Sequence, residues 1–214
     1  MPNIRLWFSP GACSVAPRIL LNEIGASYQA IRTAIADGAH LTDEFVRLNP
    51  KKRVPVLALD DAVITELPAI ATAISQLAPE RSLMGKGGLD TVRVYEWMNW
   101  LSGTLHAQGF GALWRPLRFS ADRTTHESIG AQGRATIADC FDAIEQKLVA
   151  PFAVGGAFTS VDAFLLVFYR WGNRIGIEMP ARYPRYAQFA RTLAARDAVV
   201  AAFEAENIAL DGTR

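Results

Sequence analysis

A cysteine near the start of the chain is the residue best suited to nucleophilic or redox chemistry. Cys13 follows Pro10-Gly11-Ala12 and directly precedes a segment predicted to be helical. Free backbone N–H groups and the macrodipole at a helix N-terminus stabilise an anion, so this position predicts an easily ionised thiol. The neighbouring Ser14 could donate a hydrogen bond to a thiolate. The alternative is structural, because an isolated cysteine is more often an inert core residue.

A second segment could bind an extended ligand through its backbone. Arg53-Val54-Pro55-Val56 opens a predicted strand. If Pro55 takes the cis form, Val54 exposes its N–H and C=O at a sheet edge, where they can pair with a peptide-like ligand. A plain proline at the start of a strand is the simpler interpretation of the same residues.

A carboxylate lies at the next strand-to-helix junction, in Thr65-Glu66-Leu67-Pro68. Glu66 could bind the amine of a ligand while the free N–H groups of the helix start bind a carboxylate. Its structural alternative is helix capping and compensation of the helix dipole, worth about 0.3–1 kcal/mol. The sequence favours neither interpretation.

Two polar residues of the later, helical part could reach the same ligand. Asn99 and His106 are seven residues apart and therefore lie on one face of an α-helix. A lone helical histidine is nevertheless more often structural. The three histidines, His40, His106 and His126, share no spacing typical of zinc ligands, so the sequence predicts no metal site.

Three further groups receive mainly structural interpretations. Arg115 and Arg118 stand among aromatic and aliphatic residues and could suit an apolar acid, although a solvated loop is the simpler explanation. Thr159 and Asp162 have the spacing of a helix capping box. Cys140 lies on an apolar helical stripe and is assigned to the core.

The candidate residues are distributed over two predicted structural modules, an α/β module and a helical one. The first 80 residues alternate strand-like and helical segments in the order βαβαββα, which predicts a small layered α/β structure with a mixed sheet. The predicted strands are Ile4–Phe8, Tyr28–Thr33, Val54–Leu59 and Ala62–Thr65, and the predicted helices are Val15–Ile24, Leu41–Leu48 and Pro68–Ala78. Arg81–Gly88 is polar and rich in glycine, and is the predicted linker.

Only helical patterns follow the linker. Apolar residues recur at helical spacing within Leu89–Phe110 and again over Ile137–Leu148. Ala163–Trp171 is apolar on every side, as expected of a central buried helix, and Val199–Ile208 closes the chain. We therefore predict an α/β domain over residues 1–80 and an all-helical domain over residues 89–214.

Composition excludes several classes of protein. Of the 214 residues, 50% are hydrophobic and 20% charged, as in a folded globular protein rather than a disordered one. The formal net charge of +1 gives no reason to expect nucleic acid or an anionic membrane as a partner. The chain has two cysteines far apart in sequence and no recognisable secretory signal. Its apolar stretches are much shorter than the roughly 20 residues that span a bilayer. These features predict a soluble, cytoplasmic protein.

In this order, the motifs resemble those of the glutathione S-transferases, in particular the bacterial, cysteine-containing type called beta class. The matching segments are Ser9–Ser14, Asn49–Lys51, Val54–Leu57, Thr65-Glu66, the pair Asn99 and His106, and Phe158–Ala163. The resemblance implies a thioredoxin-like N-terminal domain that binds glutathione, an all-helical C-terminal domain, a cis Pro55 and a homodimer. It also implies a transferase that conjugates glutathione to a small hydrophobic electrophile, as in detoxification, or exchanges thiols with a disulfide.

The same resemblance implies roles for individual residues. Cys13 corresponds to the family cysteine beside the glutathione sulfur, and either it or the adjacent serine is expected to contact that sulfur. Val54 would pair with the cysteinyl backbone of glutathione, and Glu66 would contact the γ-glutamyl end. Asn99 and His106 would reach the region of the sulfur.

Three departures from the family pattern fall on the ligand-binding segments. Leu67 replaces the usual serine after the glutamate, and Pro68 removes a further N–H donor. The loss of one charge-assisted hydrogen bond costs about 1.5–3 kcal/mol. Lys52-Arg53 replaces Gly-Gln and could supply a compensating cation for a ligand carboxylate. The lysine that follows the second strand in the family has no match in Thr33–Asp37.

These departures keep a second interpretation open. The chain could be a non-catalytic binding or interaction module whose glutathione site has degenerated, because one fold hosts many functions. A third interpretation is a thioredoxin-like oxidoreductase. The sequence contains no C-x-x-C, so that interpretation reduces to monothiol exchange with glutathione.

Overall fold

The N-terminal part of the chain forms a four-stranded mixed sheet in a computed structural model that describes residues 2–213. Its strands are β1 (Ile4–Phe8), β2 (Gln29–Arg32), β3 (Val56–Leu59) and β4 (Ala62–Thr65), in the order β2-β1-β3-β4. β1 pairs parallel with β2 and antiparallel with β3, and β3 pairs antiparallel with β4. All four predicted strands are confirmed, although β3 begins at Val56, two residues later than predicted.

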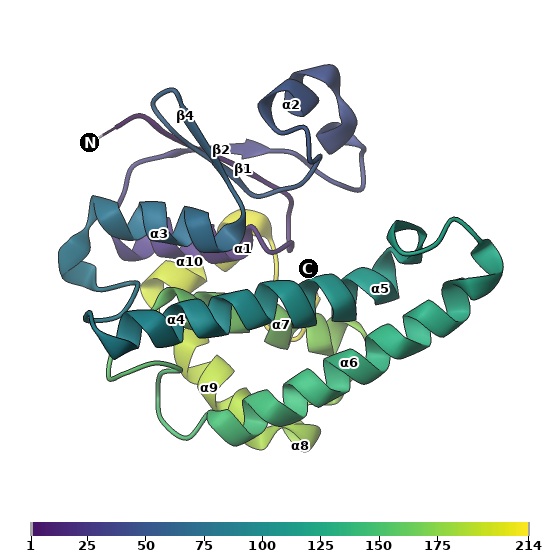
Figure 1. Ribbon diagram of the computed structural model, residues 1–214. Coiled ribbons are helices and arrows are strands. Elements are labelled where there is room, and N and C mark those ends of the chain that lie inside the picture. Colours follow the sequence, from purple (N-terminus) through teal and green to yellow (C-terminus); the bar gives the residue numbers. More distant parts are fainter. Residues whose placement is uncertain (1, 214) are drawn as a thin grey trace.

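Alternation along β1 gives this sheet two buried faces. Its helices are α1 (Val15–Glu23), α2 (Asp43–Leu48) and α3 (Leu67–Leu77), with short 3-10 turns η1 (Ala39–Leu41) and η2 (Pro79–Arg81). Ile4 and Leu6 join the main core with α1 and α3, whereas Trp7 packs in a smaller cluster with Phe45 of α2. Figure 1 shows α2 on the opposite side of the sheet from α1 and α3.

The rest of the described chain is helical. Its elements are α4 (Leu89–Trp100), the π-helix η3 (Leu101–Phe110), α5 (Gly111–Trp114), η4 (Pro116–Arg118), η5 (Arg123–Thr125), α6 (His126–Lys147), α7 (Ser160–Arg174), α8 (Met179–Arg182), α9 (Pro184–Ala194) and α10 (Asp197–Glu206). Residues 160–172 of α7 are all buried, which confirms the prediction of a central apolar helix. Among residues 2–213, no helix has the length and apolar character needed to cross a membrane.

Thr159 and Asp162 form the predicted capping box at the start of α7. One carboxylate oxygen of Asp162 accepts from the N–H and the hydroxyl of Thr159, and the other accepts from the N–H of Ala153. Burial raises the pKa of Asp162 to about 6, despite these hydrogen bonds. The buried cap fixes the first turn of α7, whose last residues line the cavity described below.

The segment predicted as one helix from Leu89 to Phe110 changes its winding part-way. It is α-helical to Trp100, and the next ten residues form a π-helix, in which hydrogen bonds span five residues rather than four. Gly109 in this segment lies against α6, since a Cβ there would be 2.9 Å from Ile137 Cγ1. The wider turns rotate the side chains away from the positions that an α-helix would give them.

The sheet-containing part packs closely on the helices. In Figure 1, α10 lies beside α1 beneath the sheet. Glu23 of α1 accepts hydrogen bonds from Arg196 at the start of α10, at 2.6 and 2.9 Å. One hydrophobic core runs through both parts, from Leu6 of β1 to Phe168 of α7. The domain limits at residues 80 and 89 therefore remain a prediction.

Candidate active site

A cavity of about 650 Å³ lies where the sheet-containing part meets the helices. One wall comes from the loop after β1, the segment before β3 and the start of α3, and the facing wall comes from η3, α5 and η4. Most residues predicted to form the site line this cavity: Cys13, Arg53, Val54, Pro55, Glu66, Leu67 and His106. Its volume is typical of small-molecule sites, which span about 300–1,000 Å³.

The loop that carries Cys13 is held by both backbone polar groups of Gly11. The N–H of Gly11 donates to Glu206 Oε2 of α10 (2.9 Å), and its C=O accepts from the indole N–H of Trp171 in α7 (2.9 Å). The backbone at Gly11 is left-handed (φ +67°), and a Cβ there would lie 2.9 Å from Arg170 Nη1. Glycine is therefore required at this position, where α7 and α10 fix the loop beside the cavity.

Glu206 is a buried anchor of this loop. Its Oε1 lies 3.0 Å from Arg18 Nε of α1, and both side chains are almost inaccessible to solvent. Burial raises the pKa of the Glu206 carboxyl to about 7, against the opposing effects of the Gly11 N–H and Arg18. The carboxyl that holds the loop therefore titrates near neutral pH.

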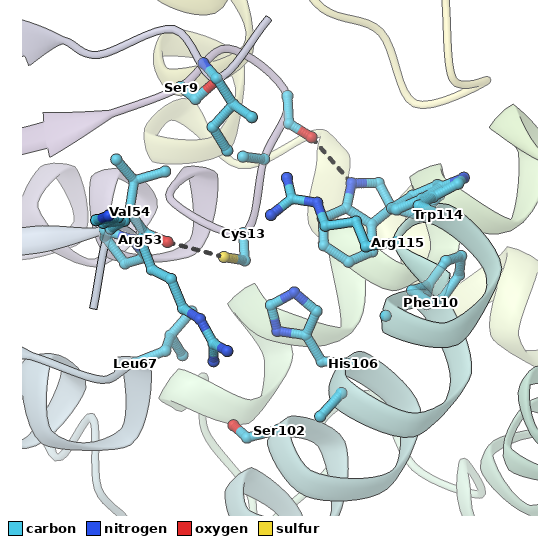
Figure 2. A pocket seen from close by; sticks show the side chains of 18 of the residues that line it. Ser9, Cys13, Arg53, Val54, Leu67, Ser102, His106, Phe110, Trp114 and Arg115 are labelled. Atoms are coloured by element: carbon cyan, nitrogen blue, oxygen red, sulfur yellow. Dashed lines mark hydrogen bonds between the residues drawn. The ribbon is translucent and has the colours of Figure 1, made fainter. Parts of the chain in front are cut away.

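Burial gives Cys13 the opposite ionisation behaviour to the one predicted. The residue is 6% exposed, and its Sγ lies 3.6 Å from the carbonyl oxygen of Val54, a contact drawn in Figure 2. Loss of hydration raises the pKa of Cys13 to about 12, although backbone hydrogen bonds and the charge of Arg115 act to lower it. The prediction of an easily ionised thiol is wrong, because enclosure by protein outweighs the nearby helix start.

Ser14 stabilises the loop and does not line the cavity. Its hydroxyl donates to the C=O of Ser9 and accepts from the N–H of the same residue, both at 3.1 Å. Ser9 Oγ in turn accepts from the N–H of Ile35 (3.2 Å). The predicted hydrogen bond from Ser14 to a thiolate does not form here, because the hydroxyl proton is already used.

The Val54–Pro55 peptide bond is cis, as the family resemblance implied, so the plain-proline interpretation is wrong. Among residues 2–213, the N–H of Val54 has no hydrogen-bond acceptor, and its C=O accepts from Cys13. Asn49 Nδ2 donates to the C=O of Arg53 (2.8 Å) and supports this turn. Figure 2 shows the Arg53 side chain extending into the cavity beside Leu67.

Glu66 has an uncommon backbone conformation at the start of α3. Its φ of +68° and ψ of 126° lie where residues other than glycine are rarely found. Such strain costs about 1–3 kcal/mol and is concentrated at functional sites. The carboxylate pairs with Lys51 and makes no capping hydrogen bond, while the N–H of Leu67 has no acceptor within residues 2–213. The geometry favours a ligand contact over a cap.

The π-helix separates His106 from Asn99. His106 points into the cavity, as Figure 2 shows, whereas Asn99 is exposed on α4 and is not among the lining residues. Seven residues return to the same face only in a regular α-helix, and the wider turns of η3 carry His106 to another face. The prediction that both residues reach one ligand is therefore wrong for Asn99.

His106 is uncharged in the cavity at neutral pH. Burial, followed by the positive charges of Arg115, Arg118 and Arg53, lowers its pKa to about 4. Its ring centroid lies 5.2 Å from that of Trp171. A neutral imidazole can both donate and accept hydrogen bonds, but it carries no charge to neutralise an anion.

Arg115 and Arg118 line the cavity, although Arg118 is also exposed to solvent, so the solvated-loop interpretation is wrong for Arg115 alone. Arg115 follows the last residue of α5 and is half-buried, and Arg118 ends η4. Lys52 lines the cavity beside Arg53, the other cation predicted for a ligand carboxylate. Arg174 and Trp171 also line it, although neither was predicted to be a site residue. Within residues 2–213, no group of three or more His, Cys, Asp or Glu side chains could hold a metal ion.

Known proteins resemble this chain in sequence and in fold. Residues 2–76 match the family model described as "Glutathione S-transferase, N-terminal domain". Glutathione S-transferase GstA of Escherichia coli O157:H7 is 28% identical over 213 residues, which cover 96% of this chain and 100% of that protein. The structure of a glutathione transferase homologue from Sulfitobacter with bound glutathione is 29% identical, with a TM-score of 0.90, and covers 96% of this chain and 99% of that one.

A sphingomonad glutathione S-transferase, solved in complex with glutathione, is 32% identical with a TM-score of 0.82, and the match covers 96% of this chain and 100% of that one. This chain belongs to the glutathione S-transferase family. The predicted fold class is confirmed: this glutathione S-transferase has a thioredoxin-like N-terminal part followed by a helical part.

Glu206→Gln is expected to flatten the pH dependence of stability. Because burial raises the folded-state pKa of Glu206 from 4.5 to about 7, the native state retains a proton that the unfolded chain releases. The stabilisation from this group is complete below the unfolded pKa and is lost as pH rises through 7. Glutamine resembles the protonated carboxyl at every pH. When the pH rises from 5 to 8, the free energy of unfolding of the variant should therefore fall by about 2–3 kcal/mol less than that of the wild type.

Urea unfolding at these two pH values measures the difference. Glu204→Gln, on the exposed side of the same helix, is the matched control and should follow the wild type. Equal pH slopes for Glu206→Gln and the wild type would show that this carboxyl does not change its ionisation on folding.

Alkylation of Cys13 by iodoacetamide should accelerate with pH and reach no plateau below pH 10. The thiolate is the reactive form, and with a pKa of about 12 its fraction rises about tenfold per pH unit over this range. Peptide mass spectrometry separates Cys13 from Cys140, with Cys140→Ala protein as the control. A plateau between pH 7 and pH 9 would mean that the thiol ionises as easily as its place before a helix implies.

Proposed function

We propose that this protein binds glutathione in the cavity and transfers it to a small hydrophobic electrophile. Its full-length relatives are glutathione S-transferases, and the Sulfitobacter and sphingomonad structures contain glutathione. The observation that carries the proposal is the free N–H of Val54, which shares one cavity with Glu66 and the free N–H of Leu67. Together these groups suit the backbone, amine and carboxylate of an extended peptide-like ligand.

Glutathione would lie along Val54 with its γ-glutamyl end at the start of α3. The Val54 N–H would donate to the cysteinyl carbonyl of glutathione, and Glu66 would accept from its amine. The Leu67 N–H would donate to the γ-glutamyl carboxylate, which the positive end of the α3 dipole also favours. Arg53, whose side chain extends into the same space, would supply a cation for a carboxylate of the ligand.

The arginines of the facing wall would stabilise the reactive thiolate. In the transfer, the glutathione sulfur attacks the electrophilic carbon, a C–S bond forms, and the leaving group departs with the bonding electrons. The thiol proton passes to solvent before the attack. Arg115 and Arg118 already lower the pKa of His106, and the same positive potential favours a thiolate bound beside it.

Cys13 would donate a hydrogen bond to the glutathione sulfur and would not itself attack. Its pKa of about 12 keeps the thiol protonated at neutral pH. The present bond to the Val54 carbonyl is long, at 3.6 Å, and hydrogen bonds to an ionised acceptor are stronger. Ser14 is engaged with Ser9, so Cys13 is the favoured of the two contacts, and disulfide exchange by Cys13 is disfavoured.

We further infer a cytoplasmic location and a role in removing reactive apolar compounds. Cys13 and Cys140 are both free thiols, which suits a reducing compartment. The aromatic side chains of Phe110, Trp114 and Trp171 line the cavity and suit an apolar electrophile.

The protein is also proposed to form a homodimer, and light scattering should give twice the 23.4 kDa chain mass. Val63 of β4 and Leu89, Val92 and Tyr95 of α4 are between 37% and 64% exposed, and both elements flank α3. Apolar side chains gathered on neighbouring elements mark protein–protein surfaces. Val92→Glu should therefore favour the monomer, whereas the control Val149→Glu, in the loop after α6, should not. A monomeric wild type at micromolar concentration would contradict the proposal.

Leu67→Ser should tighten glutathione binding by about tenfold. The added hydroxyl can donate to the γ-glutamyl carboxylate, and a hydrogen bond to a charged group contributes about 1.5–3 kcal/mol. Leu67→Ala keeps the backbone N–H but has no hydroxyl, so this matched control should not tighten binding. Calorimetric titration of reduced glutathione measures all three proteins.

The same titration tests the proposed function. We expect a wild-type Kd in the micromolar to low-millimolar range, weakened in Glu66→Ala. If neither the wild type nor Leu67→Ser gave heat with millimolar glutathione, while the protein remained folded and dimeric, the chain would be a non-catalytic module with a degenerate site.

A further inference from the structure

The cavity carries an excess of positive charge. Its cationic side chains are Lys52, Arg53, Arg115, Arg118 and Arg174. Glu66 is the one acidic residue among the described residues that line it, and its carboxylate is already paired with Lys51. The formal charge of the whole chain is only +1, so the excess is a property of this cavity.

Positive charge continues from the cavity into an adjoining depression. The ionisable side chains that line this depression are His40, Arg115, Arg118, Arg123 and His126, and no Asp or Glu occurs among its described lining residues. Arg115, Arg118 and Trp114 border both spaces, so the two arginines stand where the cavity opens into the depression.

Arg115 and Arg118 have no carboxylate partner within residues 2–213. Some other arginines of the chain are paired, as Arg18 is with Glu206 at 3.0 Å. Burial, followed by the charges of Arg115 and Arg53, lowers the pKa of Arg118, so these guanidinium groups repel one another. An anion bound between them would relieve that repulsion.

The wall beside the two arginines is aromatic. The ring of Phe110 lies 4.9 Å from that of Trp114 and 5.1 Å from that of Trp171, centroid to centroid. Trp114 and Phe119 remain 42% and 51% exposed, and both line the cavity. Figure 2 shows Arg115 next to Trp114, across the cavity from Val54. This wall can hold a flat apolar body whose charged substituent reaches the guanidinium groups.

We propose that Arg115 and Arg118 form an anion-binding end of the electrophile site, so that the second substrate is an aromatic or similarly apolar molecule that carries a carboxylate. Guanidinium groups bind carboxylates through paired, charge-assisted hydrogen bonds. Lys52 and Arg53 belong to the opposite wall beside Val54 and suit the carboxylates of glutathione. The inference rests on the proposed glutathione transfer, because it names the class of its second substrate.

A suitable probe is 4-chloro-3,5-dinitrobenzoate. The glutathione sulfur bonds to the ring carbon that carries chlorine, the C–Cl bond breaks, chloride leaves with the electron pair, and the thiol proton goes to solvent. The carboxylate takes no part in this chemistry and serves as the anchor. The corresponding benzamide has the same reactive carbon and a neutral group in place of the anchor.

Binding is measured separately from turnover with an unreactive pair, 3,5-dinitrobenzoate and 3,5-dinitrobenzamide, titrated by calorimetry with and without glutathione. The benzoate should bind about tenfold more tightly than the amide, or better, because only the benzoate can form charge-assisted bonds with the arginines. The double variant Arg115→Gln, Arg118→Gln should lose this preference. Arg182→Gln, on the exposed surface of α8, is the matched control and should retain it.

Turnover of the two chloro compounds should show the same preference in kcat/KM. In the double variant, the ratio of benzoate to benzamide should fall about tenfold or more, mainly through KM. Equal binding of dinitrobenzoate and dinitrobenzamide by the wild type would overturn the inference, whatever the turnover.

Two other outcomes separate the inference from the proposed function. If the double variant weakened the binding of dinitrobenzoate and of dinitrobenzamide by the same factor, the arginines would not recognise the carboxylate, and the inference would be overturned. If the benzoate preference were present and depended on the arginines but no glutathione was transferred, the anion site would stand and the proposed transfer would fall.

Discussion

The hydrogen bonds that hold Gly11 between α7 and α10 determine where the first loop of the protein lies. Its N–H reaches Glu206, 195 residues later, and its C=O reaches Trp171, 160 residues later. Cys13 follows two residues after this anchor, so its enclosure and its contact with Val54 depend on the same bonds. The hydrogen bonds of Gly11 join the sheet-containing part to the helices beside the cavity that lies between these two parts. The ionisation of Glu206 near neutral pH therefore couples the protonation of a buried acid to the placement of the site.

Burial and the unpaired arginines together give the cavity a positive electrostatic potential, which favours the binding of anions. Loss of hydration keeps Cys13 protonated and His106 neutral, so neither side chain supplies a charge at neutral pH. Arg115 and Arg118 remain charged beside them without a carboxylate partner among residues 2–213. Negative charge must then come from a ligand, and a thiolate and a carboxylate are the two forms that the proposed reaction provides. The same positive potential would lower the pKa of the bound thiol and orient an acidic second substrate.

Recognition in the other half of the cavity depends on backbone groups more than on side chains. The N–H groups of Val54 and Leu67 would donate to the proposed ligand whatever side chains these residues carry, and the unusual backbone of Glu66 precedes the Leu67 N–H. Leu67 can therefore replace a serine without removing the N–H that is proposed to bind a carboxylate. What the replacement removes is a hydroxyl donor, which changes the strength of binding and leaves its geometry intact.

The order of strands and helices and the capping box at Asp162 were predictable from the sequence, because these features depend on residues close together along the chain. The set of residues at the cavity was predicted in large part from ordered motifs, but their chemistry was not. Cys13 gains its high pKa from burial by segments far away in sequence, and Arg115 faces a cavity only because α7 and the first loop meet there. Asn99 and His106 lie on different faces because a π-helix, unmarked by the spacing of apolar residues, begins between them. The sequence by itself determined the secondary-structure elements, because these depend on local patterns. Only the tertiary structure decided the hydration of each side chain, its electrostatic surroundings and the direction in which it points, because these depend on segments that are far apart in the sequence.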